Sequence, residues 1–409
     1  MSDIWPTETI GDLFDIGAGK SVTPKARHGE PKHPFLRTSN VFWGRMDLRE
    51  VDSMHFTKDE IASKSLRKGD LLVCEGGDIG RAAIWNGELT DCSFQNHIHR
   101  LRSKHKNIVS RFYVYYLQSG FTQLGIYEGA GNKTTIPNLS RNRLSALSVP
   151  KPDETEQNKI AALLWKIQRA IEVEDKLTAT ARELKQATMR QLFSCGLRGE
   201  TQQETEIGPI PDSWSLRPLA ELREFLQYGT SAKCEYAKQG DPVLRIPNIL
   251  NGDIEVHDLK WCKLSAKEVD SWVLEQGDVL FIRTNGVRDR VGTCAVYHGQ
   301  PEHSLFASYL IRARLKTDRL NPDYFQYFSN TPVGRAQLAG RASPAADGKF
   351  NVNTKNIDAV LIPLPKAPEE QSEIVNILRA LDHKIRLHER KRTSMQDLFG
   401  LAPKIETTG

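Results

Sequence analysis

The chain has 409 residues, of which 39% are hydrophobic and 26% charged, and its formal net charge at pH 7 is only +5. No apolar run approaches the ~18 residues that a membrane helix needs, and the first residues lack the basic and apolar segments of a secretory signal. We therefore expect a cytoplasmic protein with no membrane partner. The six cysteines lie far apart in the sequence, which argues against a zinc ribbon or a Cys-x-x-Cys redox motif.

The second half of the sequence repeats the first. Three segments return a little over 200 residues later: Leu36–Val41 as Leu244–Ile249, Gly69–Leu72 as Gly277–Leu280, and Glu156–Ile160 as Glu370–Ile374. A period of this length is far above the ~20 to 50 residues of solenoid repeats, so each copy is a whole domain. A domain that is used twice suggests a target with two parts.

Each copy begins with strand and turn signals. The short apolar runs Leu71–Cys74 and Val279–Ile282 follow a Gly-Asp turn and precede a glycine-containing loop, which predicts a buried strand that leads into an exposed loop. Further along, the segments 111–117 and 322–328 carry aromatic residues at helical spacing. We expect these aromatic residues to pack in a core rather than to stack on a ligand.

Each copy ends with a proline-punctuated strand, a Glu-Gln pair and a long helix with apolar residues near the 3.5-residue period of a coiled coil. The first helix, from about residue 155 to 194, would be ~60 Å long, which suggests a spacer. Between the Glu-Gln pair and a shared Met-x-x-Leu-Phe end, the first helix is longer by eight residues. The two helices should pack together through Ile160, Leu164, Ile167, Ile171, Leu184, Ile374, Leu378, Leu381, Ile385 and Leu398.

Catalytic motifs are weak. Asp15–Gly19 resembles the glycine loop that holds S-adenosylmethionine in methyltransferases, but the second copy lacks it, and we interpret it as a turn. Asp153 with Glu174 and Asp175 could suggest a nuclease, yet these positions lie ~30 Å apart along one helix, too far to share a metal ion. His97 and His99 share one strand face but have no histidine counterparts in the second copy, so we expect no metal site.

The residue types that remain suit nucleic-acid recognition. Arginine and lysine pair with guanine edges and phosphates, and Asn or Gln can read adenine. The candidates are Lys20, Lys25, Arg27, Arg37, Asn40, Arg81, Gln95, Asn96, Lys133 and Arg141 in the first half, and Lys233, Lys238, Arg245, Asn248, Arg283, Asn285, Arg288, Arg290 and Lys349 in the second. For the repeated pairs Arg37/Arg245 and Asn40/Asn248, a shared structural hydrogen bond is an equally good interpretation. Non-repeated loop residues are better candidates for reading sequence.

With this organisation, the chain resembles the specificity subunit of type I DNA restriction-modification systems over essentially its whole length. The segment from Gly196 to Trp214 is especially similar to the family's linker between its central helix and its second recognition domain. The resemblance implies an α+β fold, in which two mixed α/β target recognition domains are separated by an antiparallel coiled coil of two long helices. The corresponding parts are a first recognition domain (1–152), a central helix (153–196), a linker (197–213), a second recognition domain (214–367), a distal helix (368–400) and a tail (401–409).

The resemblance also implies partners. Each recognition domain would read one half of a split, asymmetric site on double-stranded DNA. Two methyltransferase subunits and two restriction subunits would supply the catalysis, and S-adenosylmethionine, ATP and magnesium would be bound by those partners and not by this chain.

Two other classes remain open at this point. The chain could itself methylate or cut DNA, which only the Asp15–Gly19 and Asp153/Glu174 segments favour, and cofactor binding by the isolated chain would decide this. It could instead be an assembly scaffold whose basic loops are incidental. Strongly salt-dependent DNA binding without sequence preference would favour the scaffold.

Overall fold

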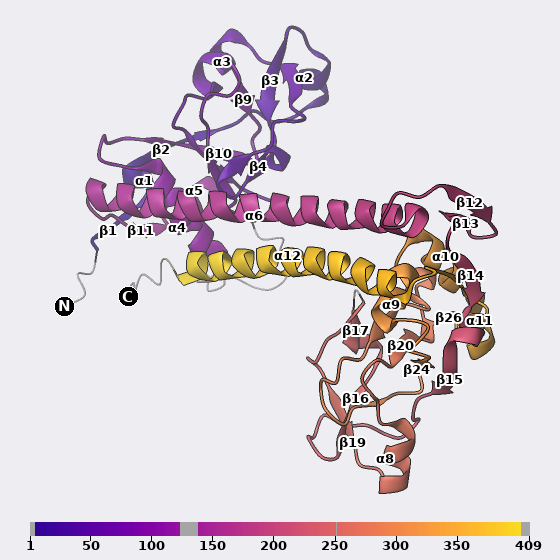
Figure 1. Ribbon diagram of the computed structural model, residues 1–409. Coiled ribbons are helices and arrows are strands. Elements are labelled where there is room, and N and C mark those ends of the chain that lie inside the picture. Colours follow the sequence, from indigo (N-terminus) through magenta and orange to yellow (C-terminus); the bar gives the residue numbers. More distant parts are fainter. Residues whose placement is uncertain (1–4, 123–137, 251, 402–409) are drawn as a thin grey trace. The chain divides into compact units, whose positions relative to one another are not determined.

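The computed structural model describes residues 5–122, 138–250 and 252–401, and it divides into two compact units. Unit 1 contains residues 1–175 and 390–409, and unit 2 contains residues 176–389. Each unit holds one mixed α/β domain together with parts of two long helices (Figure 1). We call residues 5–153 domain 1 and residues 214–367 domain 2.

Domain 1 is built on a four-stranded antiparallel sheet in the order β2-β10-β7-β8. These strands are β2 (Phe14–Ala18), β7 (Leu71–Cys74), β8 (Ala82–Ile84) and β10 (Ile98–Ser103). All four side chains of β7 are buried, because alternate residues of a strand point to opposite faces and both faces are covered. One face packs against α4 (Ser110–Thr122), whose aromatic residues are buried as predicted.

A smaller sheet in the order β6-β3-β9 completes domain 1. Its remaining elements are β1 (Thr7–Thr9), α1 (Ile10–Leu13), α2 (Pro24–His28), β3 (Lys32–Leu36), η1 (Thr38–Asn40), β4 (Val41–Phe42), β5 (Arg45–Met46), β6 (Asp52–His55), α3 (Lys58–Lys64), β9 (Ser93–Phe94), α5 (Arg141–Ser145) and β11 (Ser148–Pro150).

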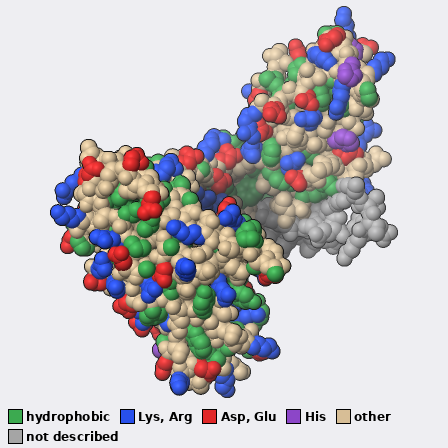
Figure 2. Space-filling model, turned by 90° about the vertical axis from the view of Figure 1, so that its right-hand side faces the viewer, with side chains coloured by type: hydrophobic (Ala, Val, Ile, Leu, Met, Phe, Trp, Pro, Cys, Tyr) green, Lys and Arg blue, Asp and Glu red, His purple; other side chains and the backbone are tan. Residues whose placement is uncertain are grey.

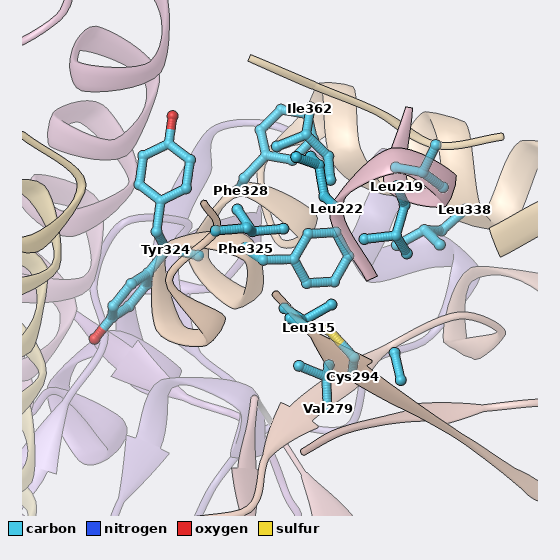
Figure 3. Packing of buried hydrophobic residues seen from close by; sticks show 14 of the residues in the cluster. Leu219, Leu222, Val279, Cys294, Leu315, Tyr324, Phe325, Phe328, Leu338 and Ile362 are labelled. Atoms are coloured by element: carbon cyan, nitrogen blue, oxygen red, sulfur yellow. The ribbon is translucent and has the colours of Figure 1, made fainter. Parts of the chain in front are cut away.

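Domain 2 repeats this architecture, with a four-stranded sheet in the order β15-β24-β20-β22 and a smaller sheet in the order β19-β16-β23. The main strands are β15 (Arg223–Tyr228), β20 (Val279–Ile282), β22 (Cys294–Val296) and β24 (Leu310–Leu315). The sequence repeat is therefore a repeat of the fold. Figure 3 shows the core, where Tyr324, Phe325 and Phe328 of α9 (Pro322–Ser329) lie over the sheet residues Val279 and Leu315.

The other elements of domain 2 are β14 (Ser215–Pro218), α7 (Leu219–Leu222), β16 (Asp241–Leu244), η2 (Ile246–Asn248), β17 (Ile249–Leu250), β18 (Asp253–Ile254), β19 (Lys260–Cys262), α8 (Ala266–Trp272), β21 (Thr284–Asn285), η3 (Arg288–Arg290), β23 (Leu305–Phe306), α10 (Pro332–Gly340), β25 (Ser343–Pro344), β26 (Phe350–Asn351), α11 (Thr354–Asp358) and β27 (Leu361–Leu364).

The long helices are α6 (Glu154–Cys195) and α12 (Pro368–Leu401), of 42 and 34 residues. In unit 1, Asp175 of α6 pairs with Arg392 near the end of α12 at 3.2 Å. In unit 2, Lys185 near the end of α6 pairs with Asp382 of α12 at 2.6 Å. In each unit the earlier part of one helix thus lies beside the later part of the other, so the two helices run antiparallel. None of the helices among residues 5–122, 138–250 and 252–401 combines the length and apolar character needed to cross a membrane.

A buried glutamine joins each long helix to its own domain. The Gln157 amide accepts a hydrogen bond from the Val109 N–H at 2.9 Å and donates to the Asn107 carbonyl at 3.3 Å and to the Pro152 carbonyl at 2.8 Å. Gln371 does the same in unit 2, where it accepts from the Asn321 N–H at 2.8 Å and donates to the Arg319 carbonyl at 3.0 Å. Both side chains are almost completely buried, so the repeated Glu-Gln pair marks a structural joint at the start of each helix.

The seam between the long helices differs from the predicted one at two positions. Leu164, Ile374, Leu378 and Ile385 are buried and Ile160, Ile167, Ile171 and Leu381 half-buried, but Leu184 and Leu398 are 51% and 57% exposed, so their assignment to the seam is wrong. Ala181, which belongs to the apolar period of α6, is buried, and so are the polar residues Glu174 and Thr178, which apolar periodicity passes over. Near the end of α12, Phe399 contacts α4 of domain 1, where its ring centroid lies 5.8 Å from that of Tyr115.

The segment 197–213, expected as a plain linker, contains a hairpin of β12 (Gln202–Thr205) and β13 (Gly208–Pro211). Ile210 of this hairpin is buried in the core of domain 2, together with Trp214 and Phe193 at the end of α6. The hairpin therefore fixes the end of α6 to domain 2. Apolar alternation could not reveal the hairpin, because β12 is entirely polar and Ile207 and Ile210 are three residues apart.

We expect the Gln371→Leu variant to unfold at a lower urea concentration than the wild type. The substitution leaves the Asn321 N–H and the Arg319 carbonyl without their Gln371 partner. Each of the two groups costs about 1–3 kcal/mol where water does not replace the lost hydrogen bond. The matched control is Gln186→Leu, an exposed glutamine of α6 in the same unit, which should change the free energy of unfolding by less than about 0.5 kcal/mol. Equal midpoints for the two variants would contradict the proposed joint.

Candidate nucleic-acid interface

Two arginines and one aspartate form the same internal frame in both domains. Arg102 binds Asp70 through two hydrogen bonds of 2.7 Å, and Arg314 binds Asp278 through two of 2.9 Å. Hydrogen bonding to the aspartate raises the pKa of both arginines. Burial lowers the pKa of the neighbouring Arg100 and Arg312, whose guanidinium groups donate to the backbone carbonyls of Ser63 in α3 and of Val273 after α8. These repeated arginines hold the fold and face inward.

The repeated asparagines are structural as well. The Asn40 amide accepts from the Arg37 N–H and donates to the carbonyls of Asp47 and Glu50, at 2.8–2.9 Å. Asn248 is completely buried and makes the equivalent bonds to Arg245, Glu255 and His257. Of the two interpretations that the sequence left open, the shared structural hydrogen bond is therefore the one that fits, and neither amide is free to read a base.

Arg37 and Arg245 belong to the same turns, and both guanidinium groups lie within ion-pair distance of an aspartate. Arg37 pairs with Asp52 at 3.1 Å and Arg245 with Asp258 at 2.9 Å. The Arg37 side chain remains 43% exposed, whereas that of Arg245 is 21% exposed. A contact of either arginine with DNA would have to compete with its aspartate.

Several candidates of domain 1 are engaged within the protein. Lys20 pairs with Glu60 at 2.5 Å and lies over the Phe56 ring, Arg81 pairs with Asp78 at 3.2 Å, and Gln95 is buried. The candidates that are at least partly accessible are Lys25 and Arg27 on α2, Asn96 before β10, and Arg141 at the start of α5. Lys133 lies outside the described residues.

The candidates of domain 2 divide between two regions. Lys233 and Lys238 lie in an exposed segment after β15, where Lys233 pairs with Glu235 at 3.0 Å and Lys238 lies over the Trp261 ring. The others follow β20 or lie in the β25–β26 hairpin that pairs with β21: Arg283, Asn285, Arg288, Arg290 and Lys349. Arg288 donates to the carbonyls of Ala339 and Gly340, and Lys349 pairs with Asp347 at 2.9 Å, whereas the Arg290 side chain is exposed.

Sequence reasoning missed the exposed aromatic side chains beside these loops. Tyr228 is 38% exposed and Tyr309 57% exposed, and the Arg283 guanidinium lies 4.8 Å from the centre of the Tyr228 ring. The available signal was that Tyr228 ends one strand and Tyr309 directly precedes another, at positions where the first copy has Ala18 and His97. Figure 2 shows that Lys and Arg side chains on the displayed face are interspersed with acidic and apolar ones.

The segments that suggested catalysis have structural explanations. Residues 14–18 form strand β2 rather than a turn, and a Cβ atom at Gly17 would lie 2.6 Å from the Arg100 guanidinium, while one at Gly19 would lie 2.2 Å from the Gln95 carbonyl oxygen. These glycines therefore accommodate the protein's own groups. Asp153 caps the start of α6 by accepting from the Glu156 N–H at 2.9 Å, and Asp175 pairs with Arg392.

His97 and His99, the two histidines weighed as metal ligands, lie in different environments. His99 is buried, its Nε2 lies 2.8 Å from the Leu139 carbonyl oxygen, and burial lowers its pKa. His97 is exposed and its Nδ1 lies 3.6 Å from a Glu75 carboxylate oxygen. Within residues 5–122, 138–250 and 252–401 there is no group of three or more His, Cys, Asp or Glu side chains placed to hold a metal ion.

Comparison with known proteins gives a consistent result. The family model described as "Type I restriction modification DNA specificity domain" matches residues 3–182 and 211–396. The EcoKI specificity subunit of Escherichia coli K12 is 25% identical, with 85% of this chain and 75% of the relative covered, and the MjaVIII specificity subunit of Methanocaldococcus jannaschii is 21% identical, with 96% and 89% covered. The crystal structure of the type I restriction-modification S subunit from M. genitalium has the same fold, with a TM-score of 0.62 at 17% identity over 99% of this chain and 96% of that one.

We expect Asn248→Ala to lower the free energy of unfolding of domain 2 by about 1–3 kcal/mol, since its three buried hydrogen bonds are lost. Arg290→Ala, in an exposed loop of the same domain, should change it by less than about 0.5 kcal/mol. Thermal unfolding followed by circular dichroism measures both. If Asn248→Ala left the stability unchanged, the assignment of this residue to the fold would fail.

Proposed function

Because this chain belongs to the family of type I restriction-modification specificity subunits, we propose that it reads a bipartite, asymmetric DNA site with one half-site for each domain. The specificity subunit is the DNA-recognition component of such a system and not its enzyme. The observation that carries the proposal is the repeat: two domains share their sheet order, buried frame and helix joint but differ in the side chains that they expose.

Binding to DNA would use two kinds of contact, one to the phosphates and one to the base edges. Exposed basic side chains such as Lys25, Arg27 and Arg290 would neutralise phosphates without reading sequence. Side chains at the strand ends and loops of each domain would contact base edges in the major groove.

The long helices would both set the distance between the half-sites and bind the methyltransferase subunits. Besides their mutual seam they expose apolar side chains: Leu163 and Val173 in unit 1, and Leu177, Leu184, Ile377 and Leu387 in unit 2. Exposed apolar side chains that recur along a helix are typical of a protein–protein contact. Two equivalent units favour two methyltransferase subunits, and by family resemblance two restriction subunits, with S-adenosylmethionine, ATP and magnesium bound by these partners.

Exchange of domain 1 tests the half-site assignment. A chimera in which residues 1–150 come from another specificity subunit should change one half of the methylated motif and leave the other half and the spacer unchanged. Methylome sequencing of cells that also contain the methyltransferase subunits measures this. A motif that changes in both halves, or in neither, would contradict one domain for each half-site.

An insertion into α6 tests the spacer. Four residues inserted after Thr178 add about one helical turn of ~5.4 Å, which should lengthen the unread DNA by one or two base pairs at ~3.4 Å each. The control is the same insertion after Gly199, which lies outside both long helices and has no atom within 4 Å of the place where a Cβ would lie. This insertion should leave the spacing unchanged. The helix would not be the ruler if the first insertion also left the spacing unchanged.

A further inference from the structure

The four-stranded sheets of the two domains carry different side chains at equivalent strand ends, which we call the edge of the sheet. In domain 1 this edge consists of Ala18 at the end of β2, Glu75 after β7 and His97 before β10. In domain 2 the same places are taken by Tyr228 at the end of β15, Arg283 after β20 and Tyr309 before β24. We call these two sets the edge triads.

The backbone shows that the positions are equivalent. The Glu75 N–H donates to the His97 carbonyl at 2.9 Å, and the Arg283 N–H donates to the Tyr309 carbonyl at the same distance. On the other side of the central strand, Ala18 is paired with His99 and Tyr228 with Ile311. The two triads therefore occupy one and the same site of a shared fold.

Away from the triads the two sheets carry alike side chains, whereas the triads differ at every position. The Arg102–Asp70 pair, at the opposite end of β7 and β10, returns in domain 2 as Arg314–Asp278. The buried Arg100 returns as Arg312, with Asp15 as the ion-pair partner of the first and Asp278 as that of the second. At the triads, a small residue, a carboxylate and an imidazole are replaced by an aromatic ring, a guanidinium and a second aromatic ring. The buried arginines and aspartates are needed for stability and therefore recur. The triad residues are not, so the two domains can differ there in what they bind.

The geometry of the second triad suits a base edge with two acceptors. The Arg283 guanidinium is steadied by the Tyr228 ring at 4.8 Å, and its Nη1 donates to the Ser308 carbonyl at 3.3 Å. Its other N–H groups can form the paired hydrogen bonds that guanine O6 and N7 accept. Tyr309, more than half exposed, adds an aromatic surface beside it.

The first triad has the opposite chemistry at the same place. The Glu75 carboxylate only accepts hydrogen bonds, and it lies 3.6 Å from Nδ1 of the exposed His97. A carboxylate is repelled by a phosphate. Because this edge carries the Glu75 carboxylate in domain 1, it does not serve to bind the DNA backbone. It is suited to the exocyclic amino groups that cytosine and adenine present in the major groove.

We propose that the edge triads are specificity determinants, and that Arg283 reads a guanine in one half-site while Glu75 reads an exocyclic amino group in the other. This proposal rests on the proposed function and adds to it the class of base that each domain recognises. The opposite charges of Arg283 and Glu75 at equivalent positions account for the recognition of two different sequences by one fold.

The test uses the full chain together with its methyltransferase subunits. Arg283→Lys keeps the positive charge but loses the fixed pair of donors, so we expect one guanine of the motif to become degenerate, with affinity for the original site falling about 10- to 100-fold. Glu75→Gln, which adds a donor, should relax one position of the other half-site. Methylome sequencing identifies the position, and binding to duplexes substituted at that position gives the change in affinity.

Arg290→Gln is the matched control, since it removes an exposed arginine of the same loop and should weaken binding to all sequences alike. An unchanged motif in Arg283→Lys, or a uniform loss of affinity like that of the control, would overturn the role of Arg283. If the wild-type complex itself placed no sequence-specific methylation, the proposed function would fail. If the wild type methylates its motif normally and both variants methylate the same motif, the proposed function is unaffected and only the role of the edge triads is disproved.

Discussion

The buried glutamine at the start of each long helix is the interaction on which the rest of the arrangement depends. Gln157 and Gln371 each connect the first turns of a helix to the backbone of the segment that leads from the central strand of the sheet into the domain's aromatic helix. The end of that sheet, where we propose that DNA is read, is thereby held in a fixed relation to the helix. The ion pairs and the apolar seam then hold α6 and α12 together, and the direction of each helix is already set by its glutamine within its own unit.

The repeated fold separates residues that maintain structure from residues that differ between the copies. Internally bonded side chains recur: the arginine–aspartate frame, the asparagine caps of the short 3₁₀ turns, and the glycines that lie against backbone carbonyls. Side chains at the strand ends do not recur. This division explains how a common scaffold can serve two domains with different exposed chemistry, because a change at the edge leaves the buried hydrogen bonds untouched.

Much of the fold was predictable because its signals are local and occur twice. The apolar strands, the aromatic helices and both long helices follow from periodicity, and the difference of eight residues between the Glu-Gln pair and the helix ends reappears in helices of 42 and 34 residues. The seam positions Leu184 and Leu398 were mispredicted, because an apolar period does not show which of its side chains are covered, and the polar residues Thr178 and Glu174 are buried instead. Among the basic candidates, sequence could not separate Arg290, which is exposed, from Lys20, whose partner Glu60 lies forty positions away.

Methylome sequencing of the host with and without this chain tests the central claim most directly. The account predicts that removal of the chain abolishes methylation at a single motif made of two different short sequences separated by a fixed number of unread base pairs. Loss of an uninterrupted motif, or no loss at any motif while the methyltransferase subunits are present, would contradict a subunit that reads two half-sites with two domains.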